Sequence, residues 1–432
     1  MPNICSYYII ESSSKKGGFA LERIIFHIDV NSAFLSWEAA KRVKNGEEDI
    51  RLIPSAIGGD RDKRTGVILA KSIPAKKFGI KTGEPVGMAL RKCPNLYLAK
   101  PDFRLYIKSS KAFMDICREY TPVVEKYSID ECFLDMTGMD ILYPDIIATA
   151  YEIKDRIYSE LGFTVNVGIG PCKILAKMAS DFEKPNKVHT LFKEEIPKKM
   201  WPLPVGELFS IGRSTAEHLE SAGIKTIGEL ARLDLKTVQS LIGDKIGKQI
   251  HDYANGIDPS PVLEEPEEAK GYSISTTLEE DVVTTESGYK ILLALADSVS
   301  ARMRADEKKA FCVGVTIRGN DFKNHSHQQT LSEATDITSE IYEISKKLFS
   351  ELWDKRTPLR LIGISLTQVT AEDNTQLSFF PTDNREKERK IDKAMDAIRS
   401  RFGSETVVRA SNYNSELNVG KKYKAQIENN KK

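Results

Sequence analysis

The sequence contains no apolar run that approaches the ~20 residues of a membrane-spanning helix. Its first residues, MPNICSYYIIESSSKKGG, also lack a charged segment followed by a signal-like apolar core. We therefore expect a cytoplasmic protein with no membrane partner, and we interpret residues 1–22 as a disordered extension.

Cysteine and histidine are scarce, with six of each among 432 residues, and no CxxC pair occurs. Scattered cysteines exclude a disulfide framework and a zinc site of the usual spacing, and they favour reduced thiols. The two closest histidines, His325 and His327, have no cysteine or acid at ligand spacing, so a metal role for them is not expected.

A strong overall charge is also missing, because the net charge is only +1. The distribution is uneven, however. Residues 61–111 carry 13 Lys or Arg against three acids, whereas residues 262–269 form an acidic segment that contains proline. A basic block of this kind indicates a phosphate-rich partner, although a merely solvated basic face explains it equally well.

Short apolar runs alternate with helical patterns in the first half of the chain. Residues 23–31 (RIIFHIDVN), 125–136 (EKYSIDECFLDM) and 163–170 (FTVNVGIG) read as buried strands. Residues 31–43 and 144–162 have helical spacing, with Asn31 or Ser32 as the N-cap of the first helix. Strands backed by helices predict an α+β domain.

Two adjacent acids, Asp130 and Glu131, interrupt the second of these strands. Neighbouring side chains of a regular strand point to opposite faces, so both acids serve one site only if the strand breaks into a turn. An adjacent acidic pair is usually solvated surface, but here apolar residues flank it on both sides, and buried carboxylates are costly unless paired or bound to a metal. Asp29, at the end of the first strand, supplies a third carboxylate. Three carboxylates on adjacent strands can hold two divalent ions for phosphoryl transfer.

The second half has a different organisation. Residues 204–260 read as short helices with Gly212 in a turn before a helix start. This helix-hairpin-helix pattern can hold a DNA phosphate at the turn amides beside Gly212 and Arg213, although an ordinary helical hairpin has the same pattern. Residues 270–370 alternate strands (311–319, 359–369) and helices (286–306, 339–355), which predicts a βαββαβ domain.

Three motifs in this order resemble the Y-family of translesion DNA polymerases: HIDVNSAFLSWE, YSIDECFLDMT and VGIGPCKILAKMASDFEKPN. The resemblance covers roughly residues 23–370. It implies an α+β multidomain fold, the right-hand polymerase fold, with a ferredoxin-like palm, small fingers, a helix-hairpin-helix thumb and a βαββαβ little finger. It also implies template-directed, error-prone DNA synthesis from dNTPs on primer-template DNA.

This resemblance sets the expected domain boundaries. They are 1–22 extension, 23–32 and 99–192 palm, 33–98 fingers, 193–260 thumb, 261–269 linker, 270–382 little finger, and 383–432 C-terminal helix and basic tail. We expect a monomer.

The resemblance also implies roles for individual residues. Asp29, Asp130 and Glu131 match the catalytic acids that bind two Mg²⁺ ions, and the carbonyl of Val30 matches a further metal ligand. Phe34 matches the aromatic steric gate that excludes a ribose 2′-hydroxyl. Lys76 and Lys184 match positions that contact the dNTP triphosphate, whereas Ile73 stands where relatives have a tyrosine and cannot donate a hydrogen bond. For Lys173 and Lys177 we leave a solvated helix face and a functional role equally open.

The C-terminal region carries a further motif, QLSFF at 376–380. Gln376, Leu377, Phe379 and Phe380 resemble the peptide that bacterial polymerases dock into the sliding clamp. Alternatively, these residues pack on a helix and short strand that we expect over residues 385–411. The core resembles the DNA polymerase IV branch, and this C-terminal arrangement resembles the lineage of the DNA polymerase V catalytic subunit, which indicates a bacterial source.

Two other functions compete with the polymerase reading. A nucleotide cyclase shares a similar palm, and GGD at 58–60 is reminiscent of one, but a cyclase has no use for residues 204–260. A non-catalytic DNA-binding scaffold is the second alternative. The presence of all three acids argues against it, because unneeded buried carboxylates are destabilising.

Overall fold

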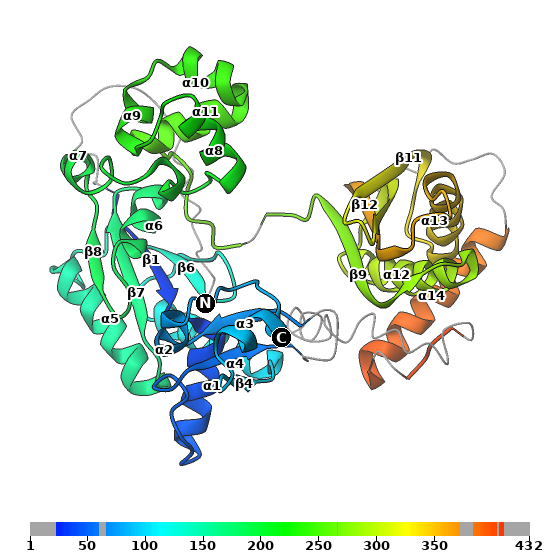
Figure 1. Ribbon diagram of the computed structural model, residues 1–432, viewed down its shortest axis with the longest axis horizontal. Coiled ribbons are helices and arrows are strands. Elements are labelled where there is room, and N and C mark those ends of the chain that lie inside the picture. The colour runs from blue at the N-terminus through cyan, green and yellow to red at the C-terminus, as the bar shows by residue number, and fades with distance from the viewer. Residues whose placement is uncertain (1–22, 60–65, 266, 372–382, 404–405, 410–432) are drawn as a thin grey trace, which may run out of the picture. The chain divides into compact units, whose positions relative to one another are not determined.

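The computed structural model of the chain describes residues 23–59, 66–265, 267–371, 383–403 and 406–409 (Figure 1). Two compact units arise from the packing within the chain. The first comprises residues 1–31 and 109–265, and the second comprises residues 32–108 and 266–432. The expected extension at 1–22 lies outside the described residues.

A five-stranded sheet forms the centre of the first unit, in the order β5-β6-β1-β7-β8. Its strands are β5 (Val124–Lys126), β6 (Glu131–Asp135), β1 (Ile25–Val30), β7 (Val165–Gly170) and β8 (Val188–Thr190). The central strand β1 runs antiparallel to both β6 and β7, and β7 runs parallel to β8. This arrangement confirms the strands expected at 23–31 and 163–170.

The segment 125–136 is not one strand, as its apolar pattern suggested, but two. Strand β5 ends at Lys126, a bend occupies residues 127–130, and β6 begins at Glu131. The amides of Tyr127 and Ser128 both donate to the carbonyl of Glu131, at 3.1 Å each, which closes the bend. The two adjacent acids therefore lie where the chain leaves a turn.

Two helices of this unit accompany β7. Helix α5 (Ile146–Leu161) begins at Asp145, whose carboxylate accepts the amides of Ile147 and Ala148, and ends at Gly162, whose φ is 79°. Helix α6 (Lys173–Asp181) packs directly on β7. A Cβ at Gly168 would lie 2.0 Å from the carbonyl oxygen of Ala176, so only glycine allows this close approach.

Short helices complete the first unit and gather at the top of Figure 1. They are η1 (Lys193–Glu195), α7 (Ile196–Lys199), η2 (Val205–Glu207), α8 (Arg213–Ser221), α9 (Ile227–Arg232), α10 (Leu235–Ile242) and α11 (Asp244–Ala254). All of them except η1 share one apolar core with α6. Gly212 is the N-cap of α8, but a single 3-10 turn precedes it, where we had expected a helix.

The second unit begins with α1 (Ala33–Lys44), whose N-cap is Ser32, as one of the two expected candidates. The Ser32 side chain makes no capping hydrogen bond, because its backbone is left-handed. A small sheet follows, in the order β3-β2-β4. Its elements are β2 (Ser55–Gly58), β3 (Ile68–Lys71), α2 (Ile73–Lys77), α3 (Val86–Lys92) and β4 (Tyr97–Ala99), before α4 (Phe103–Arg118).

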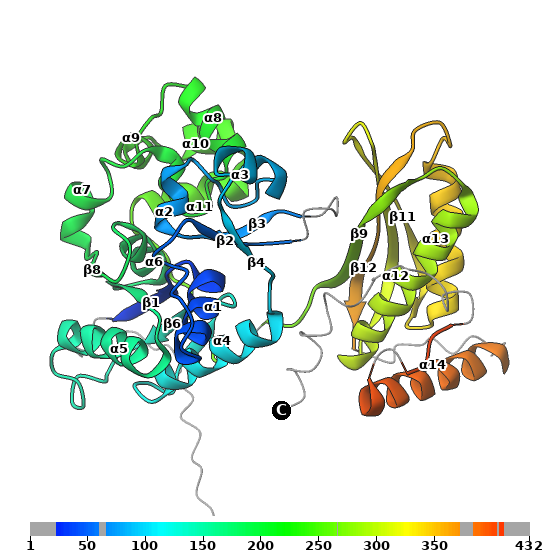
Figure 2. The same cartoon turned by 60° about the horizontal axis from the view of Figure 1, so that its bottom comes forward.

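Residues 271–370 form the expected βαββαβ domain. Its elements are β9 (Gly271–Val282), α12 (Thr285–Ala305), β10 (Lys309–Gly319), β11 (Asn324–Thr335), α13 (Thr338–Leu352) and β12 (Leu359–Thr370). The antiparallel sheet has the order β11-β10-β12-β9, and α12 and α13 cover one of its faces (Figure 2).

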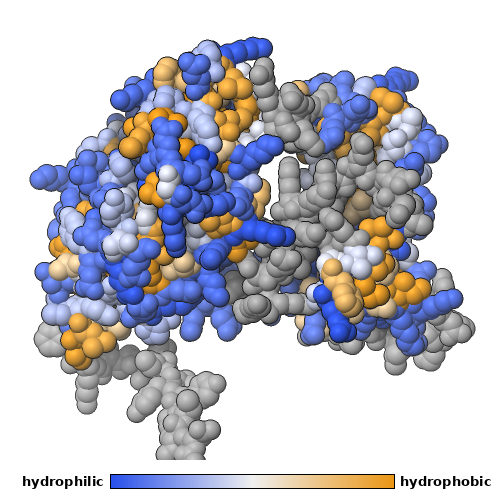
Figure 3. Space-filling view, turned by 90° about the horizontal axis from the view of Figure 1, so that it is seen from below, coloured by the Kyte–Doolittle hydropathy of each residue, from blue (hydrophilic) through white to orange (hydrophobic). Residues whose placement is uncertain are grey.

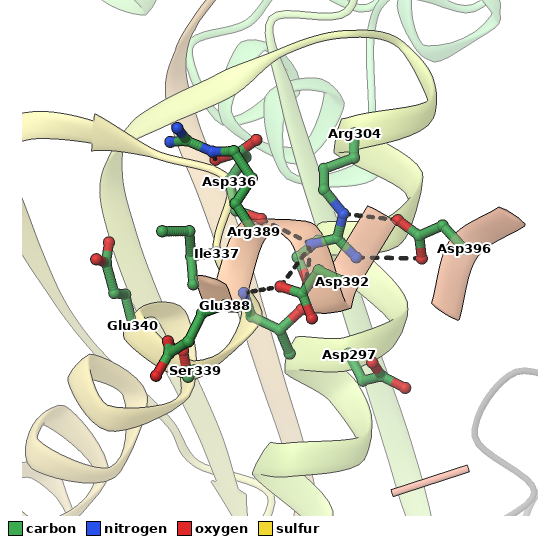
Figure 4. A network of polar contacts seen from close by, with 12 residues as sticks. Asp297, Arg304, Asp336, Ile337, Ser339, Glu340, Glu388, Arg389, Asp392 and Asp396 are labelled. Atoms are coloured by element: carbon green, nitrogen blue, oxygen red, sulfur yellow. Dashed lines mark hydrogen bonds and ion pairs between the residues drawn. The ribbon is translucent and has the colours of Figure 1, made fainter. Parts of the chain in front are cut away.

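Helix α14 (Asp383–Phe402) packs on this domain through charged side chains. Arg304 of α12 binds Asp396 at 2.7 Å and Asp392 at 3.4 Å (Figure 4). Asp392 also accepts the amide of Thr338 at 2.8 Å, so it caps α13, whose own N-cap residue, Ile337, makes no capping hydrogen bond. The opposite face of α14 exposes Ile391, Ile398 and Phe402.

The expected short strand after this helix is wrong for the residues that are described. Residues 406–409 form bends and irregular chain, and Arg409 turns back to bind Asp392 at 2.7 Å. The backbone is thus held by a side-chain ion pair instead of by strand pairing.

No helix in the described ranges is long and apolar enough to cross a membrane. On the face seen in Figure 3, hydrophobic residues form small groups scattered among hydrophilic ones. The five described cysteines are free thiols, in agreement with the expectation of reduced cysteines.

Candidate active site

Asp29 and Glu131 lie side by side on two adjacent strands of the central sheet. They are direct partners in the antiparallel pairing of β1 with β6, and the amide of Val30 donates to the carbonyl of Asp130 at 3.0 Å. Directly opposite residues of an antiparallel pair project to the same side of the sheet. The strand register therefore brings two of the three predicted carboxylates to one surface.

That surface is the one on which α6 lies. The next pairs along β1 alternate, so Asp29 and His27 share a face with Gly168 of β7, which contacts α6. The opposite face is apolar, with Ile28 and Val167 fully buried. This alternation explains why β1 reads as a continuous apolar run and still presents a carboxylate on one side.

Three lysines from α6 and the loop after it lie over the acids of the sheet. Lys173 Nζ binds Glu125 at 2.7 Å, and Lys177 Nζ binds Glu131 at 2.6 Å. Lys184 Nζ binds Asp29, and also Asp181 at 2.7 Å. From the sequence, one of two possibilities for Lys173 and Lys177 was a solvated helix face. That interpretation is wrong, because their side chains are only 14% and 9% exposed.

Asp130 has a different partner. Its carboxylate accepts a hydrogen bond from Ser128 Oγ at 2.6 Å, inside the bend that precedes β6. Among the residues described, no three His, Cys, Asp or Glu side chains are grouped so that they could hold a metal ion. In these side-chain positions lysines hold Asp29 and Glu131, and a hydroxyl holds Asp130.

The electrostatics of the site follow from its burial. Burial raises the pKa of Asp29 from 3.8 to about 6, although the ammonium group of Lys184 opposes this shift. Burial would lower the pKa of Lys177, but the hydrogen bond to Glu131 and the negative charges of Asp181, Glu131 and Asp29 together outweigh it, and the pKa is raised. The pKa of Lys184 is raised likewise, since Asp29 and Asp181 outweigh burial. Burial keeps the pKa of His27 well below its usual value. The raised pKa of Asp29 means that the effect of burial exceeds the opposing effect of the lysine.

Phe34 belongs to an aromatic cluster of the second unit. Its ring stacks on Tyr106 with 4.7 Å between centroids and meets the edges of Trp37 and Phe103. Phe34 is half-buried, and its neighbour Ala33 is buried. The packing fixes the orientation of the predicted gate residue.

Lys76 and Ile73 lie on the short helix α2, which Ser72 caps by accepting the amide of Ala75 at 3.1 Å. Both side chains are exposed, and Ile73 keeps 59% of its surface. The isoleucine side chain has no group that could donate a hydrogen bond to a phosphate.

The predicted DNA-binding residues Gly212 and Arg213 belong to the short helices of the first unit. Arg213, in the first turn of α8, has a side chain that is 91% exposed and paired with Glu217 at 2.7 Å. It follows the N-cap Gly212. The predicted clamp-binding residues Gln376, Leu377, Phe379 and Phe380 lie outside the described residues.

Three family models match the chain. Residues 28–181 match the impB/mucB/samB family and residues 269–379 match its C-terminal domain. Residues 206–258 match the thumb domain of DNA polymerase-iota. These ranges correspond to the sheet with its acids, the βαββαβ domain and the short helices, respectively.

Known proteins are similar over most of the chain. DNA polymerase IV of Clostridium acetobutylicum is 45% identical over 391 residues, which cover 90% of this chain and 98% of that protein. DNA polymerase IV 1 of Bacillus subtilis is 37% identical and covers 89% of this chain and 92% of its own length. Among solved structures, a chimeric Y-family DNA polymerase has a TM-score of 0.68 at 21% identity, over 81% of this chain and all of that one. At that identity the likeness shows the fold.

Proposed function

The chain belongs to the impB/mucB/samB family of Y-family DNA polymerases, and from this membership we propose how its residues carry out the reaction. It is a DNA-directed DNA polymerase that extends a primer along a template with dNTPs and acts in error-prone translesion synthesis. The observation that carries the assignment of its active site is the pairing of Asp29 with Glu131 on adjacent strands.

The family requires divalent metal ions, and we assign two Mg²⁺ ions to the oxygens of Asp29, Asp130, Glu131 and the main chain of Val30. The donor set fits a hard cation, because it consists only of oxygens. The raised pKa of Asp29 is a second point in favour, since a buried carboxylate with incompletely balanced charge favours a cation. When bound, the ions supply charge compensation for the attacking and leaving oxygens.

The protein's own groups then orient the reactants. The primer 3′-oxygen forms a bond to the α-phosphorus of the dNTP, its proton leaves, and the bond to pyrophosphate breaks. In our assignment Glu131 lies at the side of the primer 3′-hydroxyl, and Lys177 holds that carboxylate in place through its hydrogen bond of 2.6 Å. Lys177 is thus a positioning residue for Glu131, a role that the sequence motifs alone did not assign to it.

We assign the dNTP to Phe34, Lys76 and Lys184. The ring of Phe34 excludes a ribose by bulk, and its stack on Tyr106 keeps it from turning aside. Lys76 and Lys184 supply positive charge for the triphosphate, each as a point charge without the fork of an arginine. The present bond of Lys184 to Asp29 implies that this lysine turns from carboxylate to phosphate when the nucleotide and metal ions bind.

For DNA, we propose that the turn at Gly212 and the side chain of Arg213 contact a backbone phosphate. Support comes from the free N-terminal amides of α8, the exposure of Arg213 and the thumb-domain match. Such contacts are independent of base sequence, which suits an enzyme that accepts damaged templates. We propose a monomer located in the bacterial cytoplasm.

We also propose that Gln376, Leu377, Phe379 and Phe380 dock into the bacterial sliding clamp. Two or three apolar anchors give a weak contact, which tethering on DNA strengthens through effective concentration. Replacing all four residues by alanine should abolish stimulation by the clamp and spare clamp-free extension. If basal activity is lost instead, these residues pack against the protein and the clamp site lies elsewhere.

Primer extension by the purified protein with Mg²⁺, on undamaged and lesion-bearing templates, tests the proposal. Asp130→Asn should stop extension and leave primer-template affinity unchanged, because DNA binding depends on phosphate contacts elsewhere. Extension by the Asp130→Asn variant at the wild-type rate would show that the acids are assigned wrongly. Loss of DNA binding in this variant would show that Asp130 has a structural role.

A further inference from the structure

A fully buried asparagine on β7 makes three of its hydrogen bonds to residues 180–187, the segment around Lys184. Asn166 Nδ2 donates to the carbonyl of Ser180 at 3.0 Å and to that of Glu183 at 2.7 Å. Its Oδ1 accepts the amide of Lys187 at 3.2 Å. One side chain therefore fixes the backbone both before and after Lys184.

Asn31, the residue that follows β1, completes this arrangement. Its Nδ2 donates to Asn166 Oδ1 at 3.1 Å, and its Oδ1 accepts the amide of Asn186 at 2.9 Å. Asn31 is buried, and its own amide is bonded to the carbonyl of Thr164 at 3.0 Å. The two asparagines thus join the strand end that carries Asp29 to the loop that carries Lys184.

Asn186 is held from a third side. The almost fully buried Lys154 of α5 donates to Asn186 Oδ1 at 3.2 Å. The φ of Asn186 is 62°, a left-handed conformation that asparagine tolerates better than most residues. The loop 183–187 is consequently tied to the residue that follows β1, to β7 and to α5.

We infer that Asn166 and Asn31 are positioning residues for the dNTP triphosphate, acting through Lys184. A lysine side chain is flexible but of limited length. The position of its backbone therefore decides which phosphate oxygens its ammonium group can reach. Buried polar groups that are fully satisfied are rigid, and the loss of one partner leaves others unsatisfied. This inference rests on the proposed function, in which Lys184 binds the triphosphate.

The expected effect is a loss of nucleotide affinity, with DNA affinity unchanged. Removing Lys184 itself should weaken dNTP binding roughly 10- to 100-fold, as for a hydrogen bond to a charged group. Asn166→Ala removes the hydrogen bonds to the carbonyls of Ser180 and Glu183 and from the amide of Lys187, and we expect a loss of roughly 10-fold. Asn31→Ala removes the hydrogen bond from the amide of Asn186 and leaves the bonds of Asn166 to the loop in place, so its effect should be smaller.

The test measures dNTP binding without chemistry. A primer that ends in a dideoxynucleotide is bound to template and protein with Mg²⁺, and the complementary dNTP is titrated to obtain its Kd in the ternary complex. The proteins compared are the wild type, Asn166→Ala, Asn31→Ala, Lys184→Ala and the double variant Asn166→Ala/Lys184→Ala. We expect the double variant to bind dNTP as weakly as Lys184→Ala alone, because both changes remove one and the same contact.

Thr121→Val serves as the matched control. It also removes a buried side-chain hydrogen bond of the first unit, from Thr121 Oγ1 to the carbonyl of Asp135 at 2.6 Å, but at the other end of β6. It should lower the melting temperature and leave the Kd for dNTP unchanged. Should Asn166→Ala fail to fold, Asn31→Ala with Lys184→Ala completes the same cycle.

Three results would overturn the inference. One is an unchanged dNTP Kd in both asparagine variants. Another is full additivity of the asparagine and lysine changes, which would mean that the asparagines act by another route. The third is an equal loss of dNTP affinity in Thr121→Val, which would make the effect one of general stability. If the wild type itself shows no saturable dNTP binding, the proposed function fails as well, so the two failures are distinguishable.

Discussion

The carboxylates of Asp29 and Glu131 lie opposite each other on antiparallel strands, and each is bound by a lysine that follows β7 in the chain. Lys177 comes from α6 and Lys184 from the loop after it. The acids belong to the sheet, and the lysines belong to α6 and the loop after it. The distance between α6 and the sheet therefore determines whether the ammonium groups can reach the carboxylates. A substitution far from any substrate can therefore act on the site by changing that distance.

Glu131→Gln should reduce the rate of primer extension by roughly 1,000-fold, because a carboxylate that compensates the metal charge is lost. Glutamine keeps an oxygen that can accept the hydrogen bond of Lys177, so the buried lysine retains a partner. Single-turnover extension measures the effect, and primer-template affinity is the control. A rate near that of the wild type would contradict the catalytic role.

Phe34→Val should raise ribonucleotide incorporation relative to dNTP incorporation by roughly 100-fold, since the bulk beside the sugar is removed. The same change also breaks the stack on Tyr106. Tyr106→Leu is the matched comparison, because it breaks the stack but keeps the Phe34 ring, so it should raise ribonucleotide incorporation less than Phe34→Val does. Equal discrimination between the two sugars in Phe34→Val and in the wild type would exclude the gate.

Gly168→Ala should displace α6, because the new Cβ would lie 2.0 Å from the carbonyl oxygen of Ala176 and 2.4 Å from the amide nitrogen of Ser180. We expect the free energy of unfolding to fall by about 3 kcal/mol, at the upper end of what overpacking typically costs. Primer extension should be lost as well. Gly87→Ala, where a Cβ meets nothing within 4 Å, is the control and should change neither. Melting temperature and extension rate are the measurements.

Asp29 should make the stability of the metal-free protein depend on pH. Its pKa in the folded protein, about 6, exceeds the ordinary value of 3.8, so the protonated carboxyl favours the folded state. This contribution is fully present below pH 3.8 and is lost as the pH rises through 6. Relative to Asp29→Asn, the free energy of unfolding of the wild type should fall by up to about 3 kcal/mol between pH 4 and pH 7. Urea denaturation at several pH values measures it, and a constant difference would refute the assignment.

Asp392→Ala should destabilise the βαββαβ domain by about 3 kcal/mol, because it leaves the buried Arg304 with one partner fewer and uncaps α13. Glu386→Ala is the control on the same helix. It breaks the exposed pair with Lys390, whose two side chains are more than 70% exposed, and it should change stability by less than about 0.5 kcal/mol. Thermal unfolding distinguishes the two, and equal melting temperatures would contradict the role of Asp392.

Many strands and helices of this fold could be predicted from the sequence, because buried faces require apolar residues at a regular spacing. The runs at 23–31 and 163–170 became β1 and β7, and the four elements expected between 286 and 369 all formed. Asp29 and Glu131 could be foreseen as neighbours from their places at the ends of buried strands. The bend at 127–130 was a condition for using both acids, and it formed.

Other features could not be read from local patterns. Lys173 and Lys177 have the spacing of a solvated helix face, and only the close approach of α6 to Gly168 turns them toward carboxylates of the sheet. Helix α14 has an amphipathic pattern, but periodicity assumes that the apolar side faces inward. In α14 the charged side faces the domain, because Arg304 and Asp297 of α12 form ion pairs with Asp396 and Arg399 of α14.

The cap that Asp392 places on α13 also has a consequence for the order in which the nascent chain can fold. The amide of Thr338 and its acceptor on Asp392 are 54 residues apart. While the ribosome is still translating that interval, α13 has no side-chain cap from Ile337 and Arg304 lacks both of its aspartate partners. The domain that begins at residue 271 therefore reaches its final stability only after α14 has emerged, and a premature stop codon between residues 371 and 392 would weaken helices encoded well upstream of it.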